Sequence, residues 1–378
     1  MATLTFLTTT LFDHGASRQL VDVLRMHGIS RPMLCTDRGL VAAGIVEQIE
    51  TVISNSVQSV RFDETPENPT EEAVLAAAER YRAEGCDGLL AVGGGSSIDL
   101  AKAVALRVTH DGDLMQYTAG EGGVERIGPV APLIAVPTTA GTGSEVSSGS
   151  VVIMSNGEKL IFASRHLTPR TAVCDPELTF GLPPLLTAAT GMDAMTHCIE
   201  AVLSPQVNPP AEAVGLDGLR RGLGHGHLLG AVKDGKDPDA RWNMMMASTE
   251  GAMAFSKGLG AVHSMSHACG ALPGLRLHHG TLNAVFLPTV LRFNADHVGD
   301  KYARIREAAC LDAKVDLADY IEQLNASLGL PANLAAMGVT ADHIPGLAQH
   351  AARDVCTFTN PRPASVDDYA KLIEAAMG

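Results

Sequence analysis

The chain lacks the features that would direct it out of the cell or into a membrane. Met1 is not followed by a basic start and a long apolar core, and no run approaches the ~18 apolar residues of a membrane-spanning helix. The seven cysteines include no CxxC pair, and an odd number cannot all pair within one chain. We therefore expect a cytoplasmic protein that is neither anchored nor exported.

An excess of basic residues is also absent. The formal net charge of -14 argues against nucleic acid or an anionic membrane as the main partner, because phosphate binding needs a basic face. There is no block of like charges, internal repeat or low-complexity tract. With 378 residues, 46% hydrophobic and 19% charged, the chain can form two folded domains. Small-molecule chemistry fits this composition better than binding of a polyanion.

The order of secondary-structure signals divides the chain at Leu182. Before it, short apolar runs alternate with helical stretches such as Thr70 to Arg82, which predicts a parallel sheet with crossover helices. After Pro183 and Pro184 nearly all signals are helical. We therefore predict an α/β domain over 1–182 and an all-helical domain over 183–378. The expected strands are Pro32 to Thr36, Gly88 to Val92, Leu133 to Pro137 and Ala172 to Cys174; the expected helices of the second domain include Pro184 to Leu203, Asn208 to Leu229, Asp239 to Phe255, Val262 to Ala271, Thr281 to Asn294 and Tyr302 to Cys310.

A glycine-rich turn links one predicted strand to a helix. The segment Gly93 to Asp99 follows the apolar run Leu89 to Val92 and precedes Leu100 to Arg107. Glycines let the backbone approach a pyrophosphate, and the N-terminus of the next helix offers free N–H groups. The segment is not a GxGxxG fingerprint, so a plain strand-to-helix turn is the alternative interpretation.

Two further segments suit a nucleotide. The loop Pro137 to Glu145 also follows an apolar strand, and loops at neighbouring parallel strand ends share one crevice. Asp37 comes just after the second predicted strand, where a carboxylate can accept hydrogen bonds from an adenosine ribose and repel a 2'-phosphate, which favours NAD over NADP. An ordinary polar loop and an ordinary loop aspartate are the alternatives.

Histidines gather in the helical half of the chain. Asp193 and His197 lie four positions apart, so both point from one helical face, and His263 and His267 repeat that spacing. His279 follows after a short loop. A carboxylate and imidazoles so arranged suit a divalent metal, whereas surface pairs of this kind are the alternative for each pair alone. The clustering in apolar and glycine-rich surroundings favours the metal.

Together these motifs resemble the iron-containing (group III) alcohol dehydrogenase family, which has a dehydroquinate synthase-like fold, and the resemblance runs in the same order over nearly the whole chain. It implies a dinucleotide-binding first domain and a metal-binding, catalytic second domain. It matches Gly93 to Asp99 to the diphosphate loop, Pro137 to Glu145 to the nicotinamide and ribose loop, and Asp37 to the NAD-selecting acid. The implied cofactor contacts are Asp37, Gly94, Gly95, Ser96, Ser97, Asp99, Thr138, Thr139, Thr142, Lys159, Leu178 and Thr179.

The same resemblance implies a metal held by Asp193, His197, His263 and His279. A mixed oxygen and nitrogen ligand set suits Fe(II), and Zn(II) is a possible occupant. His267 falls on a family position that lines the site without binding metal, where it can relay a proton or orient substrate. His278 matches no family role that we can assign.

One segment departs from the family pattern. Ser256, Lys257 and Gly258 supply three residues where many relatives have four, and they introduce a lysine. We expect this loop to border the substrate, so that Lys257, with Arg276, binds an anionic group such as the carboxylate of a semialdehyde. The alternative is an exposed loop lysine.

The resemblance implies a metal-dependent NAD(H) oxidoreductase that interconverts a small primary alcohol, carboxylated or not, and its aldehyde. The alternatives that share the fold are a maleylacetate reductase-like oxoacid reductase, a glycerol dehydrogenase-like polyol dehydrogenase and a dehydroquinate synthase-like lyase. A metal-dependent hydrolase would leave Asp37 and both glycine-rich loops unexplained. By analogy with the family we expect a homodimer or a higher homo-oligomer, in which a strand over Thr3 to Thr8 pairs across a two-fold axis.

Overall fold

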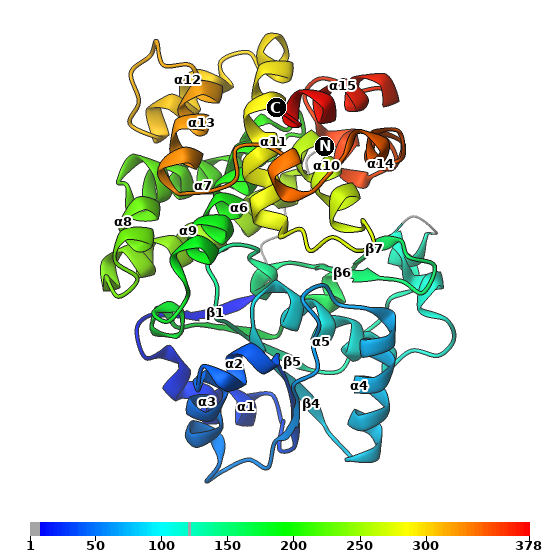
Figure 1. Ribbon diagram of the computed structural model, residues 1–378. Helices are drawn as coiled ribbons and strands as arrows, with labels where there is room; N and C mark the ends of the chain where they lie inside the picture. The colour runs from blue at the N-terminus through cyan, green and yellow to red at the C-terminus, as the bar shows by residue number, and fades with distance from the viewer. Residues whose placement is uncertain (1–7, 120–121) are drawn as a thin grey trace. The chain divides into compact units, whose positions relative to one another are not determined.

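The computed structural model describes residues 8–119 and 122–378 (Figure 1). It divides into two compact units. The first comprises the described residues up to Thr139 together with Ser144–Gly181, and the second comprises Ala140–Gly143 and Leu182–Gly378. The strand expected over Thr3 to Thr8 lies outside the described residues, apart from Thr8 itself.

The first unit is built on a parallel six-stranded sheet. Its strand order is β1-β8-β5-β4-β2-β3, and every pair in it is parallel. Strands β4 and β5 lie at the centre and are wholly buried, as expected for strands covered on both faces. The bounds are β1 (Thr9–Phe12), β2 (Pro32–Cys35), β3 (Val60–Phe62), β4 (Gly88–Gly93), β5 (Leu133–Pro137) and β8 (Thr171–Cys174).

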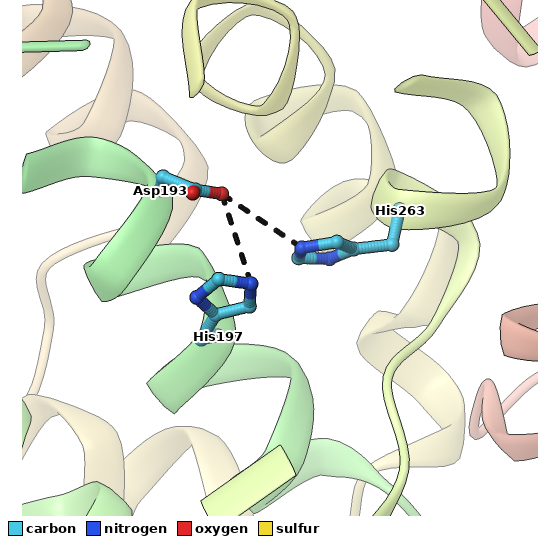
Figure 2. A group of neighbouring side chains, drawn as sticks. All are labelled: Asp193, His197 and His263. Atoms are coloured by element: carbon cyan, nitrogen blue, oxygen red, sulfur yellow. Dashed lines mark ion pairs between the residues drawn. The ribbon is translucent and has the colours of Figure 1, made fainter. Parts of the chain in front are cut away.

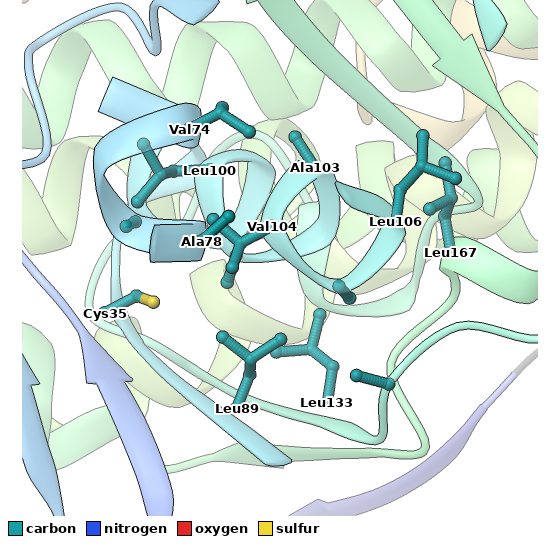
Figure 3. Close-up of a cluster of buried hydrophobic side chains, with 14 of the residues drawn as sticks. Cys35, Val74, Ala78, Leu89, Leu100, Ala103, Val104, Leu106, Leu133 and Leu167 are labelled. Carbon is teal, nitrogen blue, oxygen red and sulfur yellow. The ribbon is translucent and has the colours of Figure 1, made fainter. Parts of the chain in front are cut away.

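Helices cover both faces of this sheet. Alternate side chains of one strand enter different cores: Leu89 packs with α4 and α5 residues, whereas Leu90 packs with α1 and α3 residues. Figure 3 shows the first core, with Leu89 and Leu133 facing Val104. This layering confirms the α/β fold expected for the first half of the chain. The helices are α1 (Leu20–Met26), α2 (Arg38–Ala42), α3 (Ile45–Ile53), α4 (Glu71–Ala83) and α5 (Gly95–Arg107).

A small antiparallel hairpin, which the sequence analysis did not predict, also belongs to this unit. Strands β6 (Gly149–Ile153) and β7 (Lys159–Ala163) pair with each other and with no strand of the main sheet. The turn between them contains Asn156 and Gly157, and Gly157 has a φ of 84°, which glycine adopts without strain. An Asn-Gly pair between two apolar runs is a hairpin signal, so the sequence did carry the information.

The second unit is helical, as expected. Helix α6 (Pro184–Leu203) is buried along almost its whole length and packs against α7, α9 and α11. It begins at Pro184, with Pro183 as the N-cap residue, and proline is well suited to the first turn of a helix. The other helices are α7 (Pro209–Leu219), α8 (His227–Lys233), α9 (Pro238–Ala254), α10 (Ala261–Gly270), α11 (His279–Asn294), α12 (Lys301–Ala308), α13 (Leu317–Ser327), α14 (Ile344–Ala351) and α15 (Val366–Ala376).

One predicted helix is interrupted. The stretch Asn208 to Leu229 forms α7, a π-helical turn η8 (Arg220–Gly224) and the start of α8. Gly226 has a φ of 73°, and a Cβ on Gly224 would lie 2.5 Å from the carbonyl oxygen of Ala308. The glycines therefore allow a close approach and a chain reversal that a continuous helix would not. Among the described helices, none combines the length and hydrophobicity that a bilayer crossing needs.

Candidate functional site

The four predicted metal ligands converge in the second unit. Asp193 and His197 come from one face of α6, His263 comes from the first turn of α10, and His279 begins α11. The Nε2 atoms of His197, His263 and His279 lie 3.7, 3.9 and 3.7 Å from Oδ1 of Asp193. Figure 2 shows Asp193, His197 and His263 pointing toward one another.

This donor set fits a divalent metal. The separations from Asp193 exceed hydrogen-bond length, but ligand bonds of about 2 Å to one ion leave ligand atoms about 3 to 4 Å apart. Burial lowers the pKa of His197 to about 4, so its ring is neutral at neutral pH, which is the form that binds metals. The side chain of His279 is 25% exposed, whereas those of the other three ligands are almost completely buried.

Glu200 organises the predicted ligand His263. Its Oε2 lies 2.6 Å from Nδ1 of His263, and the same carboxylate accepts hydrogen bonds from the backbone N–H groups of Gly260, Val262 and His263. Helix α10 has no side-chain cap of its own, so a residue of α6 satisfies its free N–H groups. The carboxylate accepts a hydrogen bond from the Nδ1–H group and so leaves the lone pair of Nε2 facing Asp193. Burial lowers the pKa of His263, but the contact with Glu200 outweighs it and the pKa is raised.

His267 lies beside the four ligands. Its ring stacks on that of His279, with centroids 5.4 Å apart and planes 10° from parallel. Its Nδ1 lies 2.9 Å from Oδ2 of Asp354. Burial alone would raise the pKa of Asp354. The contacts with His267 and the backbone N–H of Cys356 have the larger, opposite effect, so the pKa is lowered to about 2. Asp354 is therefore a carboxylate that fixes the orientation of the His267 ring.

His267, Asp354 and Cys356 form a second group with ligand atoms within 4.8 Å of one another. The hydrogen bond between His267 and Asp354 accounts for that proximity. Burial raises the pKa of the Cys356 thiol well above its ordinary value, and a protonated thiol is a poor ligand. We therefore assign this group to the orientation of His267 and not to a second metal.

The predicted nucleotide residues follow the carboxyl ends of neighbouring strands. Asp37 follows β2, Gly94 follows β4, Thr138 and Thr139 follow β5, and Leu178 lies beyond β8. These four strands are adjacent in the order β8-β5-β4-β2, so their carboxyl ends share one edge of the sheet. That edge is where open α/β sheets bind ligands.

The turn into α5 has the geometry that a phosphate needs. Gly94 is the N-cap of α5 and provides no side-chain cap, and Gly95 is the first helical residue. A Cβ on Gly93 would lie 2.4 Å from Oγ of Ser97, so this close turn requires glycine. Ser97 is buried, and Ser96 donates its hydroxyl hydrogen to the carbonyl of Glu67. The first N–H groups of α5 are therefore uncapped by side chains and can bind an anion.

Asp99 and Lys159, two predicted cofactor contacts, have protein partners. One carboxylate oxygen of Asp99 accepts from Oγ of Ser144 and the other from the N–H of Val151. Its carboxylate therefore ties α5 to the loop after β5 and to the hairpin, and its predicted contact with the cofactor stays a prediction. Nζ of Lys159 donates to Oδ1 of Asn68.

The remaining predicted contacts are fixed locally. Asp37 accepts from the N–H of Leu40 and so caps α2. Thr138 and Leu178 are buried, and Thr179 donates to the carbonyl of Pro176. Thr142 belongs to the short segment Ala140–Gly143 that packs with the helical unit.

Lys257 is neither free to bind a substrate carboxylate, as expected, nor an exposed loop lysine, as in the alternative interpretation. It is 3% exposed, and its Nζ donates to Oε2 of Glu212 at 2.7 Å and to the carbonyl of Val202 at 3.1 Å. Arg304 pairs with the other oxygen of Glu212. An ammonium engaged in this way is not available to a substrate carboxylate, so the predicted role of Lys257 in substrate binding is corrected to a structural one.

Arg276 and His278 lie in the loop between α10 and α11. Arg276 is exposed and stands three residues before the ligand His279. His278 is the N-cap residue of α11. Of the two basic side chains predicted to meet an anionic substrate group, Arg276 is the one with an exposed position.

Several residues of the site were missed by sequence reasoning. Glu200 lies three positions after His197, and Asn283 lies four positions after His279, so helical spacing alone would have placed each on a ligand-bearing face. Asp354 carried no such signal, because it reaches His267 from a distant segment.

Lys102 is fully buried and donates to Ser144, Ser147 and Gly149; burial lowers its pKa to about 8 despite the nearby carboxylates.

Comparisons with known proteins agree with this architecture. Residues 8–176 match the family model described as iron-containing alcohol dehydrogenase, and residues 187–377 match that of the Fe-containing alcohol dehydrogenase family, C-terminal. The chain is 52% identical to 4-hydroxybutyrate dehydrogenase of Cupriavidus necator over 100% of both chains. It is 34% identical to NAD-dependent methanol dehydrogenase of Bacillus methanolicus, over 97% of this chain and 98% of that one. A solved structure of 1,3-propanediol oxidoreductase superposes with a TM-score of 0.93 at 33% identity, covering 100% of both chains.

A parallel sheet, a helical unit and a buried aspartate and histidine cluster are the features expected of a metal-dependent dehydrogenase with a dehydroquinate synthase-like fold. The chain belongs to the iron-containing alcohol dehydrogenase family. It is an oxidoreductase that interconverts an alcohol or hydroxy acid and the corresponding aldehyde.

Proposed function

We propose that this enzyme oxidises an ω-hydroxy carboxylate of the 4-hydroxybutyrate type to its semialdehyde, and catalyses the reverse reduction, with NAD(H) and a divalent metal. The observation that carries the proposal is the convergence of the Asp193 carboxylate with the imidazoles of His197, His263 and His279. The substrate class is supported by the 52% identity to a full-length relative named 4-hydroxybutyrate dehydrogenase.

We propose that Asp193, His197, His263 and His279 hold Fe(II), with Zn(II) as the alternative ion. When bound, the ion would act as a Lewis acid on the substrate oxygen, and the oxidised nicotinamide would accept a hydride from the carbinol carbon. Glu200 keeps Nδ1 of His263 protonated, so that Nε2 is free to coordinate.

His267 is the proposed catalytic residue for the proton. Asp354 holds its Nδ1, which leaves Nε2 to receive the substrate hydroxyl proton and pass it to solvent. Alcohol and NAD thus give aldehyde, NADH and one proton. In the reverse direction the same ring returns the proton to the oxygen of the reduced aldehyde.

The nucleotide is proposed to bind at the carboxyl edge of the parallel sheet. The uncapped start of α5, at Gly94 and Gly95, would receive the diphosphate. Asp37 would select NAD over NADP by repelling a 2'-phosphate. The other proposed contacts at or near this edge are Ser96, Ser97, Thr138, Thr139, Thr142, Lys159, Leu178 and Thr179.

Arg276 is the proposed partner of the substrate carboxylate. It is exposed, its guanidinium can pair with a carboxylate in a bidentate manner, and it stands close in sequence to His279. Because Lys257 is paired with Glu212, the proposal needs no contribution from that lysine.

Anaerobic purification with metal analysis tests the function directly. The assay compares oxidation of 4-hydroxybutyrate and 1-butanol with NAD or NADP, with and without a chelator, in the wild type, His263→Ala and the control His225→Ala, which removes an exposed histidine outside the site. For the wild type and His225→Ala we expect about one ion per chain and chelator-sensitive turnover with NAD. We expect His263→Ala to lose both the ion and the turnover. A metal-free protein that still reduces a carbonyl would reject the metal centre and favour an oxoacid reductase.

We also propose that the enzyme is a cytoplasmic homodimer. All seven cysteines are free, as expected in a reducing compartment, and the dimer is an analogy with the family. Light scattering of the purified protein and fractionation of the source cells test these two points.

A further inference from the structure

The side chain of Asn283 lies in the middle of the proposed ligand set. It is fully buried on α11, one helical turn after His279. Its Nδ2 is 2.7 Å from Oδ1 of Asp193, 3.2 Å from Nε2 of His263 and 3.3 Å from Nε2 of His279. One amide nitrogen therefore contacts ligand atoms from three helices.

Close packing of α11 on α6 brings Asn283 to this position. Gly280 stands where a Cβ would lie 2.2 Å from the carbonyl oxygen of Ala189 and 3.1 Å from Cβ of Asp193. The absence of that side chain lets the first turn of α11 lie directly against the ligand-bearing turn of α6. Asn283, on the next turn, then reaches across to the Asp193 carboxylate.

The hydrogen-bond chemistry identifies Nδ2 as a donor to lone pairs. An amide nitrogen has two N–H groups and accepts nothing, so its two hydrogens are shared among three neighbours that act as acceptors. His263 can do so, because its other nitrogen, Nδ1, carries the ring proton and donates a hydrogen bond to Glu200. His279 can do so as well, since Oγ of Ser266 lies 3.3 Å from its Nδ1 and can accept a hydrogen bond from an Nδ1–H group.

Coordination of a metal excludes part of this arrangement. A neutral imidazole nitrogen has one lone pair, which cannot serve an N–H donor and an ion at the same time. The carboxylate of Asp193 has several lone pairs and can serve both. Metal binding must therefore displace Asn283 from the two imidazoles, whereas its contact with Asp193 can persist.

The opposite end of the amide fits such a change of partner. Oδ1 of Asn283 is buried and has no hydrogen-bond partner within the described residues. Leaving a buried carbonyl oxygen unsatisfied is unfavourable, so it calls for an explanation in a native site. The amide nitrogen contacts the proposed metal ligands while the amide oxygen has no partner among the described residues. The amide can therefore reorient when a metal binds these ligands.

We propose that Asn283 is a placeholder for the metal: its amide N–H groups hold His263 and His279 toward Asp193 when no ion is bound, and it releases both imidazoles when the ion enters. The inference rests on the metal site proposed above. It assigns Asn283 a role in setting how readily the metal is bound and released, and none in the chemical step.

The sign of the effect follows from thermodynamic linkage. Contacts made only in the ion-free protein stabilise that state and so weaken metal binding. Removing them with Asn283→Ala should tighten binding by about three- to tenfold, the equivalent of about one neutral hydrogen bond. The same variant should lower the Tm of the ion-free protein more than that of the loaded protein.

Asn325→Ala is a matched control. Asn325 is also buried, donates through Nδ2 to the carbonyl of Ala284, and has an Oδ1 without a partner, but it contacts no proposed ligand. Its removal should lower the Tm of the ion-free and loaded proteins equally and leave metal affinity unchanged.

The experiment measures the Kd of Zn(II) and Co(II) by competition with a chromophoric chelator, and the Tm with and without ion, for the wild type and both variants. Tighter binding by Asn283→Ala alone supports the proposal. Equal or weaker binding by Asn283→Ala, with normal binding by the wild type, overturns it and leaves the metal site intact. Failure of the wild type to bind an ion rejects the proposed function itself, and the placeholder with it.

If Asn283→Ala fails to fold, crystal structures of the chelated and Zn(II)-loaded wild type give the answer. The proposal expects Nδ2 to lie within 3.3 Å of both imidazole nitrogens only in the chelated protein. Unchanged contacts in the loaded protein would overturn it.

Discussion

Glu200 serves two functions through one carboxylate, because it holds the ring of His263 and satisfies the N-terminus of α10. Glu200→Gln keeps the shape and one acceptor but loses the charge that fixes the protonated Nδ1. Partners of this kind change metal affinity by about 10- to 100-fold when they are mutated. We expect a loss in that range, measured by chelator competition, while the far-UV circular dichroism remains that of the wild type.

The control for this variant is Glu250→Gln. Glu250 is also a buried carboxylate of the helical unit, but it contacts Arg221 and no proposed ligand. The metal affinity of Glu250→Gln should equal that of the wild type. An equal loss of affinity in both variants would show that any buried carboxylate matters, and would remove the specific role of Glu200.

Glu250 also predicts a pH dependence of stability. Burial raises its pKa from 4.5 to about 8, despite the opposing effect of Arg221. Between these two values the folded protein binds more protons than the unfolded chain, so the free energy of unfolding falls as pH rises from about 4.5 to 8. Glu250→Gln removes this titration. Its stability relative to the wild type should therefore rise over that window, by roughly 1 to 3 kcal/mol in total.

Thermal unfolding at pH 5, 6, 7 and 8 measures this difference, with Glu322→Gln as an exposed carboxylate control. We expect the Tm of Glu250→Gln minus that of the wild type to grow steadily with pH, and no such growth for the control. A difference that does not change with pH would mean that Glu250 is ionised throughout.

At the residue scale, the sequence predicted which donor types would gather but not what each would contact. Asp193 and His197 could be paired from helical spacing alone, and resemblance added His263 and His279. The environments of Lys257 and Asp99 could not be foreseen, because their partners Glu212 and Ser144 are about 45 positions away. Whether a charged side chain is free or paired depends on such distant contacts.

At the scale of elements, Lys257 comes from the short turn Phe255–Lys257 after α9 and caps the end of α6. Its ammonium and that of Lys301 donate to the last carbonyls of this helix, at Val202, Leu203 and Ser204. Cations at a helix C-terminus satisfy free carbonyls and interact favourably with the helix dipole. Helix α6 carries Asp193 and His197, so Lys257 stabilises the element that holds half of the proposed metal ligands.

Lys257→Met should therefore affect stability and not substrate choice. It leaves Glu212 paired only with Arg304, and breaking a buried ion pair costs about 2 to 4 kcal/mol when one partner remains. We expect a lower Tm and an unchanged ratio of kcat/KM for 4-hydroxybutyrate and 1-butanol. A change in that ratio without a loss of stability would restore Lys257 as a substrate contact.

Arg276→Ala gives the complementary result. Loss of a guanidinium that binds the substrate carboxylate should raise KM for 4-hydroxybutyrate at least about tenfold, because charged hydrogen bonds contribute about 1.5 to 3 kcal/mol. The KM for 1-butanol, which has no carboxylate, should stay the same. The Tm of Arg276→Ala should also equal that of the wild type, because Arg276 is exposed. Equal KM changes for both alcohols would contradict the assignment.

The elements themselves were largely predictable. Strand β5 and helix α6 have the expected bounds, because a continuous apolar run and a proline-initiated helix are strong local signals. The helix expected over Asn208 to Leu229 was too long. Gly224 lies against the carbonyl of Ala308, and Gly226 adopts a positive φ, which interrupts the helix. The hairpin β6–β7 was not predicted, although the Asn156-Gly157 pair indicates its turn.

At the scale of the whole molecule, the proposed metal ligands and most of the proposed nucleotide contacts belong to different units. Asp193, His197, His263 and His279 all lie in the helical unit, whereas Asp37 and the Gly93 to Asp99 segment lie in the sheet unit. The sheet unit has its own hydrophobic cores, one on each face of the sheet, so loss of the ion from the helical unit need not disturb the sheet. Sequence order predicted this division, because strand signals end where the helical half begins.

Chelation should therefore separate catalysis from nucleotide binding. We expect an excess of chelator to abolish alcohol oxidation while the Kd of NADH, measured by fluorescence titration, changes by less than about threefold, or about 0.7 kcal/mol. Asp37→Ala should do the reverse: it should keep the ion and lose discrimination against NADPH. Restored turnover on adding Fe(II) or Zn(II) would show that the chelator acted only on the metal. If chelation weakened NADH binding as strongly as it reduced turnover, the ion would have to support the nucleotide directly, and the assignment of the two functions to separate units would fail.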